Sequence, residues 1–339
     1  LMCTSRGRNS LQPRILVLKL HLCNTGTERL RLRTFWWMAA ATVAVVCCGC
    51  GAHVITKTTT SQPAARPVAK DATREELVER YNVFARGIQT LNATVELKPI
   101  AGSAYSGVIQ EYHEVKAFLL VAQPASVRVI GQVPIVGKTA FDMASDGTTF
   151  QVSIPSKNKF LVGSVANVRN SDKPIENLRP EHLLEAFLWP EIRNGEEVLL
   201  EEFDTDTGRY YVLTVLRGGY RTEILRKVWF DRSDLQVSRI ENFAPKGLLM
   251  ADIQFSDWRA TDAAAGTAVP VAANGINALA NFAHVIEINR PHDDYRLDLQ
   301  VTKITINEPI AASRFQLLQP PGSELVRVGE ENAARDHKP

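Results

Sequence analysis

The sequence has few of the residues on which catalytic and metal sites are built. It holds five cysteines, and four of them precede residue 50, so the rest of the chain keeps only Cys50. No Gly-x-Ser-x-Gly motif and no Walker A loop is present. The histidines after residue 50 show no metal-ligand spacing; they are His53, His113, His182, His284, His292 and His337. We therefore expect a non-catalytic protein without a metal or cofactor.

An excess of basic charge is also missing. The formal net charge is +2, from 39 basic and 37 acidic residues. Seven basic residues and one acid precede residue 50, which leaves 32 basic and 36 acidic residues after it (39 less 7, and 37 less 1). Nucleic-acid binding needs a basic patch or stripe, and the chain after residue 50 is mildly acidic, so we expect no nucleic-acid partner. The adjacent acids Asp293 and Asp294 fall in a predicted turn, where we expect them to be solvated.

The basic charge before residue 50 belongs to a leader, residues 1–49, with a signal peptide at 29–49. Arginine alternates with leucine at 29–33, and the apolar run that follows has about 15 residues, fewer than the ~20 of a membrane-spanning helix. The run ends where Gly49 precedes Cys50, which resembles a bacterial lipobox. The resemblance implies lipid attachment at Cys50. An uncleaved membrane segment and a cleaved but unlipidated protein remain the alternatives.

The lipobox also carries an expectation about location. In lipoproteins of this kind an Asp after the cysteine favours the inner membrane, and Gly51 stands there instead. The resemblance implies a protein anchored in the cell envelope at the outer membrane and facing the periplasm. Lipidation by two or more acyl chains gives stable membrane anchoring, whereas one chain binds reversibly.

Beyond the leader the sequence predicts a tether and one mainly β domain of α+β class. Residues 50–70 are rich in Thr, Pro and Ala without an apolar period, which is typical of a flexible linker. In the domain at 71–322, short period-2 segments alternate with turn signals, which indicates antiparallel strands. A loop insertion is predicted at 259–282 and a polar tail at 323–339. The predicted strands are 94–98, 108–114, 117–122, 126–130, 139–144, 149–154, 159–162, 197–203, 210–216, 222–230, 235–242, 249–255, 284–289 and 296–306.

Two helices are predicted among the strands. Thr73 and Glu76 form a capping box that opens the first one. Apolar residues at helical spacing give it one buried face; they are Leu77, Tyr81, Phe84, Ile88 and Leu91. The second helix is predicted at 180–189, with Pro180 in its first turn and Pro190 after its end.

The last predicted strand changes phase along its length. Apolar residues alternate from Leu297 to Val301, but Ile304 and Ile306 fall on the other face of a regular strand. One extra residue near 302–303 would bring both sets to the same face. The sequence therefore predicts a β-bulge there.

Two stretches resemble LolA/LolB-like proteins. Residues 125–163, with the hairpin signal Asp146-Gly147, look like the central sheet of that family, and residues 227–258 look like its later hairpins. The resemblance spans about residues 71–321. It implies an antiparallel sheet curled into an incomplete half-barrel, with helices covering a concave apolar face that accepts acyl chains of lipoproteins or other lipids.

The resemblance also implies a set of site residues. Residues 117–122 are apolar at every position, as expected for a strand covered on both faces. The cavity and lid residues expected on this basis are Leu77, Tyr81, Phe84, Phe118, Leu120, Val129, Phe141, Leu184 and Phe187. The family carries an exposed apolar residue on a loop that contacts the membrane, and Val133, Ile135 and Val136 lie in a Gly-flanked loop of that kind.

A second interpretation stays open from the sequence. The helices could plug the half-barrel permanently, which would leave a non-catalytic envelope lipoprotein that docks other envelope proteins. A loop like that at 133–136 could equally fold back onto the sheet.

Overall fold

The computed structural model describes residues 67–103, 107–167, 177–206, 208–263 and 281–328. All of them belong to the compact unit that begins at Arg66. The leader, Cys50 and most of the predicted tether lie outside these ranges, as does the interior of the predicted loop at 259–282. Within the described ranges, no helix has the length and apolar character needed to cross a membrane.

Helix α2 spans Arg74–Gly87, and its start follows the prediction. Thr73 Oγ1 accepts a hydrogen bond from the Glu76 backbone N–H at 3.2 Å, and Glu76 Oε2 accepts one from the Thr73 N–H at 2.8 Å, which confirms the capping box. The helical spacing that continues to Leu91 predicts a longer helix, and this was wrong. Ile88 is already extended, and Leu91 belongs to the next strand, because Gly87 terminates the helix and the chain turns into the sheet.

Helix α3 spans Pro180–Phe187, two residues less than predicted. Pro180 stands at its first position, where a backbone N–H would have no helical partner. Leu188 is extended, so Trp189 leaves the helix and packs separately.

The described chain is mainly β-structure, as predicted. The strands are β1 (Thr90–Ser103), β2 (Val108–Glu111), β3 (Val115–Ala122), β4 (Ser126–Gln132), β5 (Thr139–Ser145), β6 (Thr149–Ile154), β7 (Lys159–Ser164), β8 (Glu196–Asp204), β9 (Arg209–Arg217), β10 (Glu223–Asp231), β11 (Val237–Ala244), β12 (Leu248–Ala260), β13 (Asp262–Ala263), β14 (Asn281–Arg290), β15 (Tyr295–Ile306) and β16 (Glu324–Val328).

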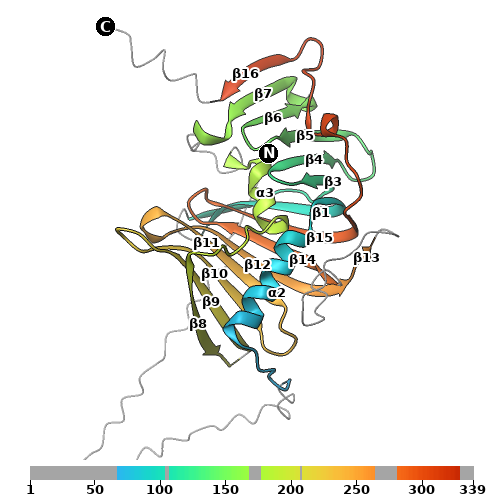
Figure 1. Ribbon diagram of the computed structural model, residues 1–339. Helices are drawn as coiled ribbons and strands as arrows, with labels where there is room; N and C mark the ends of the chain where they lie inside the picture. The colour runs from blue at the N-terminus through green and yellow to red at the C-terminus, as the bar shows by residue number, and fades with distance from the viewer. Residues whose placement is uncertain (1–66, 104–106, 168–176, 207, 264–280, 329–339) are drawn as a thin grey trace, which may run out of the picture. The chain divides into compact units, whose positions relative to one another are not determined.

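These strands form one sheet in the order β16-β7-β6-β5-β4-β3-β1-β15-β14-β12-β11-β10-β9-β8, with β2 beside β1 and β13 beside β15. Neighbours are antiparallel except in the β16–β7 and β13–β15 pairs, which are parallel. Within the described chain β16 and β8 do not pair, so the sheet curls without closing into a barrel, as the predicted half-barrel requires. Figure 1 shows α2 and α3 against one face of the sheet, which we call the inner face.

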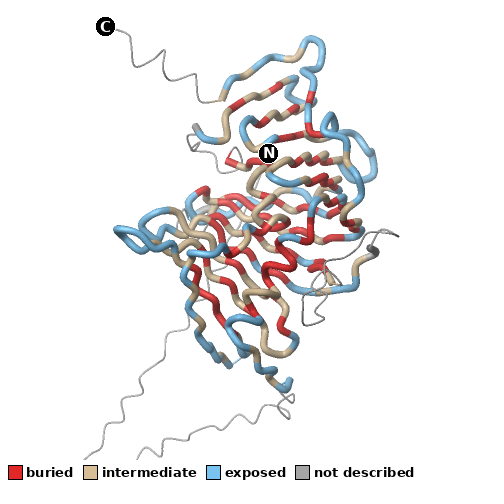
Figure 2. The backbone as a smooth tube through the Cα atoms, in the orientation of Figure 1, coloured by how far each residue is buried: buried red, intermediate tan, exposed pale blue. Residues whose placement is uncertain are grey.

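Buried residues are concentrated where the helices meet the sheet (Figure 2). Successive side chains of a strand point to opposite faces, so every second side chain lies on the inner face. Leu119 of β3 lies opposite Val129 of β4 there, and Ile253 of β12 lies opposite Ile288 of β14. Together with the helices they form one apolar cluster that runs through both halves of the sheet. Each fully buried side chain of this kind contributes about 1.5–3 kcal/mol, so the cluster is the main source of stability.

The predicted bulge in β15 is present. Thr94 of β1 lies opposite Lys303, but the next residue, Val95, lies opposite Val301, so Thr302 is the extra residue. The Thr302 hydroxyl donates a hydrogen bond to the Thr94 carbonyl at 3.0 Å.

The hairpin between β5 and β6 also follows its sequence signal. Gly147 has a φ of 88°, which a residue with a side chain rarely adopts. The Asp146 carboxylate accepts hydrogen bonds from the backbone N–H groups of Thr148 and Thr149, both at 2.8 Å. The turn is therefore fixed by the two residues that predicted it.

The C-terminal part of the described chain differs from the predicted polar tail. Residues 324–328 form β16, which pairs in parallel with β7 and forms one edge of the sheet. Before it, Leu317 packs on the outer face against Ala144 and Phe160. Sequence reasoning missed this strand because its apolar alternation is short and its partner strand is distant along the chain.

Candidate functional site

The inner face and the two helices that cover it form the candidate site. Leu77, Tyr81 and Phe84 project from α2, and Leu183 and Phe187 from α3; each is at most 4% exposed. All five belong to the same apolar cluster as the inner side chains of the strands. The inner face is thus filled by the protein's own side chains.

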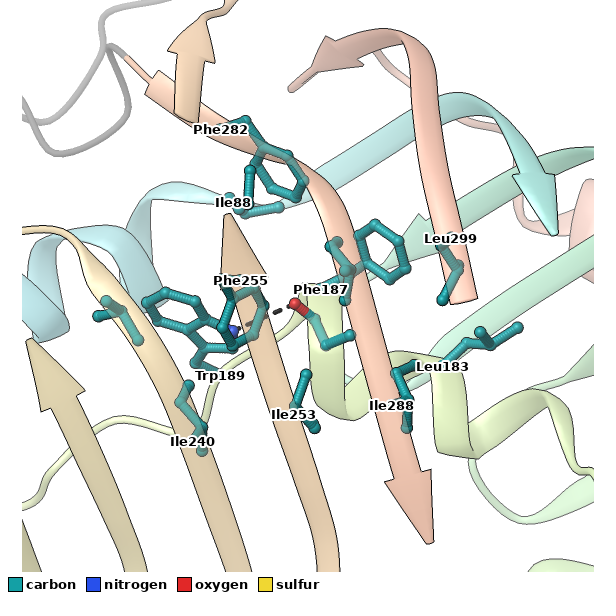
Figure 3. Close-up of a cluster of buried hydrophobic side chains, with 14 of the residues drawn as sticks. Ile88, Leu183, Phe187, Trp189, Ile240, Ile253, Phe255, Phe282, Ile288 and Leu299 are labelled. Carbon is teal, nitrogen blue, oxygen red and sulfur yellow. Dashed lines mark hydrogen bonds between the residues drawn. The ribbon is translucent and has the colours of Figure 1, made fainter. Parts of the chain in front are cut away.

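An aromatic group centred on Trp189 joins the helices to the sheet (Figure 3). The Trp189 ring stacks on Phe84 with centroids 4.0 Å apart and meets Phe255 edge-on at 5.4 Å. Phe187 stacks on Phe282 at 6.0 Å. The indole N–H donates to the Ala186 carbonyl at 3.2 Å, so this buried polar group is satisfied.

Polar contacts bind α2 to the segment that follows α3. Asn82 Nδ2 donates to the Ile192 carbonyl at 3.0 Å, and Asn82 Oδ1 accepts from the Ile192 N–H at 2.8 Å. The Tyr81 hydroxyl donates to the Pro190 carbonyl at 3.0 Å. Burial raises the pKa of Tyr81 to about 12, which keeps this hydroxyl protonated. The two helices and residues 188–192 therefore form one connected cover, which we call the lid.

A buried polar cluster holds α3 to the sheet. Arg290 of β14 pairs with Glu185 of α3 at 2.7 Å and with Asp293 at 2.6 Å. The other Glu185 oxygen accepts from Asn242 Nδ2 at 3.0 Å. Burial disfavours the Arg290 charge, but the two carboxylates and Tyr295 outweigh it and hold the pKa of Arg290 above its usual range. The expectation that Asp293 is solvated was wrong: it is 6% exposed, because the turn folds it against Arg290.

His182 of α3 and the buried Tyr295 of β15 form a second polar contact, which is partly buried. His182 Nδ1 and the Tyr295 hydroxyl are hydrogen-bonded. Burial, together with the nearby Arg290 and Arg179, lowers the pKa of His182 well below its ordinary value, so this imidazole is neutral at pH 7. Burial raises the pKa of Tyr295 well above its ordinary value. Sequence reasoning missed this pair, because residues 113 positions apart carry no local signal of contact.

The structure brings together seven of the nine predicted cavity and lid residues. Five lie in the apolar cluster and two pack half-buried against it; these are Leu77, Tyr81, Phe84, Val129 and Phe187, then Phe141 and Leu184. Phe118 and Leu120 lie on the outer face instead. Leu119 of β3 is the residue that faces inward, and its neighbours on either side must face outward.

The loop between β4 and β5 is exposed and tightly turned. Val133, Ile135 and Val136 are 42%, 107% and 63% exposed. The Val136 N–H donates to the Pro134 carbonyl at 2.8 Å across Ile135, which has a φ of 69°. A β-branched residue in such a γ-turn is strained, and strain of this kind concentrates at functional positions. The loop does not fold back onto the sheet.

Other kinds of site find little support in the described ranges. No group of three or more His, Cys, Asp and Glu side chains there could hold a metal ion. One pocket lies at the start of the domain, between Pro67, Ala69 and the chain around Arg232. The lipid attachment site proposed at Cys50 falls outside the described residues.

Comparisons with known proteins give similarity at the level of structure. No family model matches the chain, and no curated protein matches its sequence. It is similar to a LolA superfamily protein from Nitrosomonas europaea, with 11% identity, 73% of this chain and 99% of that chain covered, and a TM-score of 0.43. It is also similar to a domain described as outer membrane lipoprotein-sorting from Vibrio parahaemolyticus, with 12% identity, 71% and 95% covered, and a TM-score of 0.44.

Proposed function

We propose that this protein is a non-catalytic carrier or receptor that binds the acyl chains of lipoproteins or other lipids against its inner face, beneath the lid. The observation that carries the proposal is the chemistry of that face, where one apolar cluster runs through both halves of the sheet beside the polar groups around Arg290 and Arg226. An acyl chain fits the apolar cluster, and the polar part of the same molecule fits the charged groups.

Binding requires the lid to move, because its side chains occupy the inner face. Displacing Leu77, Tyr81, Phe84, Leu183 and Phe187 costs about 8–15 kcal/mol at about 1.5–3 kcal/mol each. An acyl chain of about fifteen methylenes regains about 12 kcal/mol at ~0.8 kcal/mol each. The two amounts are similar, so an acyl chain could replace the lid side chains reversibly.

The proposal assigns membrane contact to the loop at 133–136. Its support is the exposure of three apolar side chains on one strained turn, with Lys138 following. Apolar side chains that insert at the membrane surface, flanked by a basic residue, are typical of interfacial binding.

The proposal further includes a lipid anchor at Cys50, a tether at 50–70, the binding domain at 71–322 and an outer-membrane location facing the periplasm. Its support is the lipobox resemblance and the low-complexity composition after it. With residues 51–66 extended at about 3.4 Å each, the domain could reach about 55 Å from the anchor.

A second candidate function is a protein-interaction module of the envelope with a permanently filled core. The observation that favours it is the packing of the lid, in which Leu77 and Phe187 are 0% exposed. In that case the helices belong to the core and never leave it.

Binding of a fluorescent fatty acid to delipidated, detergent-purified protein separates the two functions. If the protein is a carrier, it binds the probe. The variant Asn82→Ala loosens the lid, so a larger fraction of molecules has the inner face open and the probe binds several-fold more tightly. Phe160→Ala, a matched change in the outer-face cluster, should leave the affinity unchanged. If no form binds the probe, and protein from native membranes carries no lipid by mass spectrometry, the carrier is excluded and the module is favoured.

A further inference from the structure

Strand β8 forms an edge of the sheet on the side opposite β16. On one side β8 pairs with β9, in a continuous register from the pair Glu196 and Arg217 to the pair Asp204 and Arg209. Apart from an isolated bridge between Asn194 and Glu196, no described segment pairs with its outer side. An edge of this length offers a row of free backbone N–H and C=O groups to another strand.

The outer face of β8 has a regular chemistry. Its side chains alternate between acid and apolar residues at two-residue spacing; in order they are Glu197, Leu199, Glu201 and Phe203. Leu199 is 54% exposed and Phe203 is 46% exposed. The Phe203 ring meets Trp229 edge-on at 5.2 Å, so it is held in place on the surface.

The charges of β8 differ between its two faces. On the inner side, Glu196 pairs with Arg226 at 3.4 Å and Glu202 pairs with Arg232 at 2.7 Å. On the outer face, the described residues supply no cationic partner for Glu197 or Glu201. Two negative charges and two apolar groups therefore remain available beside the free edge.

These features fit a partner strand better than a protected edge. Proteins protect edge strands with charges, bulges or covering loops, and exposed apolar side chains on the edge work against that protection. A second copy of β8 is a poor partner, because β8 carries five acids and no basic residue and so has no cation to place beside Glu197 or Glu201.

We propose that β8 binds an extended segment of a partner protein by strand addition, and that this segment presents basic and apolar side chains alternately on one face. Backbone hydrogen bonds to the edge give affinity, as in other strand-addition complexes. Lys or Arg beside Glu197 and Glu201, and apolar groups beside Leu199 and Phe203, give the register. The site is independent of acyl-chain binding beneath the lid.

The probe that tests this is a fluorescent peptide of the length of β8, in which Lys and Val alternate on one face and Thr fills the other. We expect the full chain in mild detergent to bind it by fluorescence anisotropy, and a peptide with Glu in place of Lys to bind at least tenfold more weakly. The variant Glu197→Lys/Glu201→Lys should no longer bind the Lys peptide. The control variant Glu308→Lys/Glu324→Lys changes the charge by the same amount at exposed positions elsewhere and should still bind the Lys peptide.

Backbone methylation separates strand addition from charge attraction. N-methyl groups on one alternate set of peptide amides should abolish binding, and on the other set should not, because only one set faces the edge of β8. Equal binding of both methylated peptides, equal loss in both double variants, or no binding of the Lys peptide would overturn the proposal. These outcomes leave acyl-chain binding unaffected, so the two functions are tested separately.

Discussion

Asn82 of α2 and Ile192 exchange two hydrogen bonds, so one side chain satisfies both backbone groups of a residue 110 positions away. Both residues are buried, at 8% exposure each. The contact joins the first helix to the chain that leaves the second helix, and it makes the lid one unit.

Asn82→Ala should lower the free energy of unfolding by about 1–3 kcal/mol, because it leaves a buried N–H and a buried carbonyl of Ile192 without partners. Denaturant unfolding measures this. Asn92→Ala, at an exposed position of β1, is the control and should change stability by less than about 0.5 kcal/mol. Equal effects of the two substitutions would show that the Asn82 contact does not stabilise the lid.

Arg290→Leu should be among the most destabilising single changes in the domain, by about 3–5 kcal/mol, because it leaves the buried Asp293 carboxylate without its cation and removes the partner of the partly buried Glu185. The exposed pair Arg74–Glu75 gives the comparison, and Arg74→Leu should cost at most about 1 kcal/mol. Thermal unfolding of both variants tests the difference. A loss below 1 kcal/mol for Arg290→Leu would mean that water reaches the cluster.

The free energy of unfolding should decrease as the pH is lowered below about 6.5, and His182 is the cause. Its folded pKa is lowered well below the unfolded value of about 6.5, so the unfolded chain takes up a proton that the folded chain excludes. The loss is at most about 1.4 kcal/mol per pH unit, from pH 6.5 down to the folded pKa. His182→Gln should flatten this dependence between pH 6.5 and 5, whereas His113→Gln, at an exposed position, should not. An unchanged slope in His182→Gln would contradict the neutral buried imidazole.

Ile135→Asn should weaken binding to anionic vesicles without lowering stability. Asn tolerates positive φ better than a β-branched residue, so the folded domain should keep or gain up to about 1 kcal/mol. Vesicle co-sedimentation of protein that carries Cys50→Ala isolates the contribution of the loop. Leu318→Asn removes another exposed apolar side chain, at 91% exposure, and should leave vesicle binding unchanged. If both variants bind like the parent, the loop has no membrane role.

Much of the fold could be predicted from local sequence. The capping box at Thr73, the turn at Asp146-Gly147 and the bulge at Thr302 depend on residues a few positions apart, and the structure confirms each of them. The prediction failed where pairing with distant strands outweighs local spacing. Leu91 fits a helical spacing but belongs to β1, where it pairs with β3 and β15.

The sequence by itself determined both helices and most of the strands, though not β16, because period and turn chemistry are local properties. It could not determine which side of β3 faces the lid, since β3 is apolar on both sides. Pairing with β4 and coverage by the helices decided that Leu119 faces inward and Phe118 and Leu120 outward. The same holds for the contact of Glu185 with Arg290, which are 105 positions apart: only the packing of α3 against the sheet brings the two charges together and buries the Arg290 guanidinium.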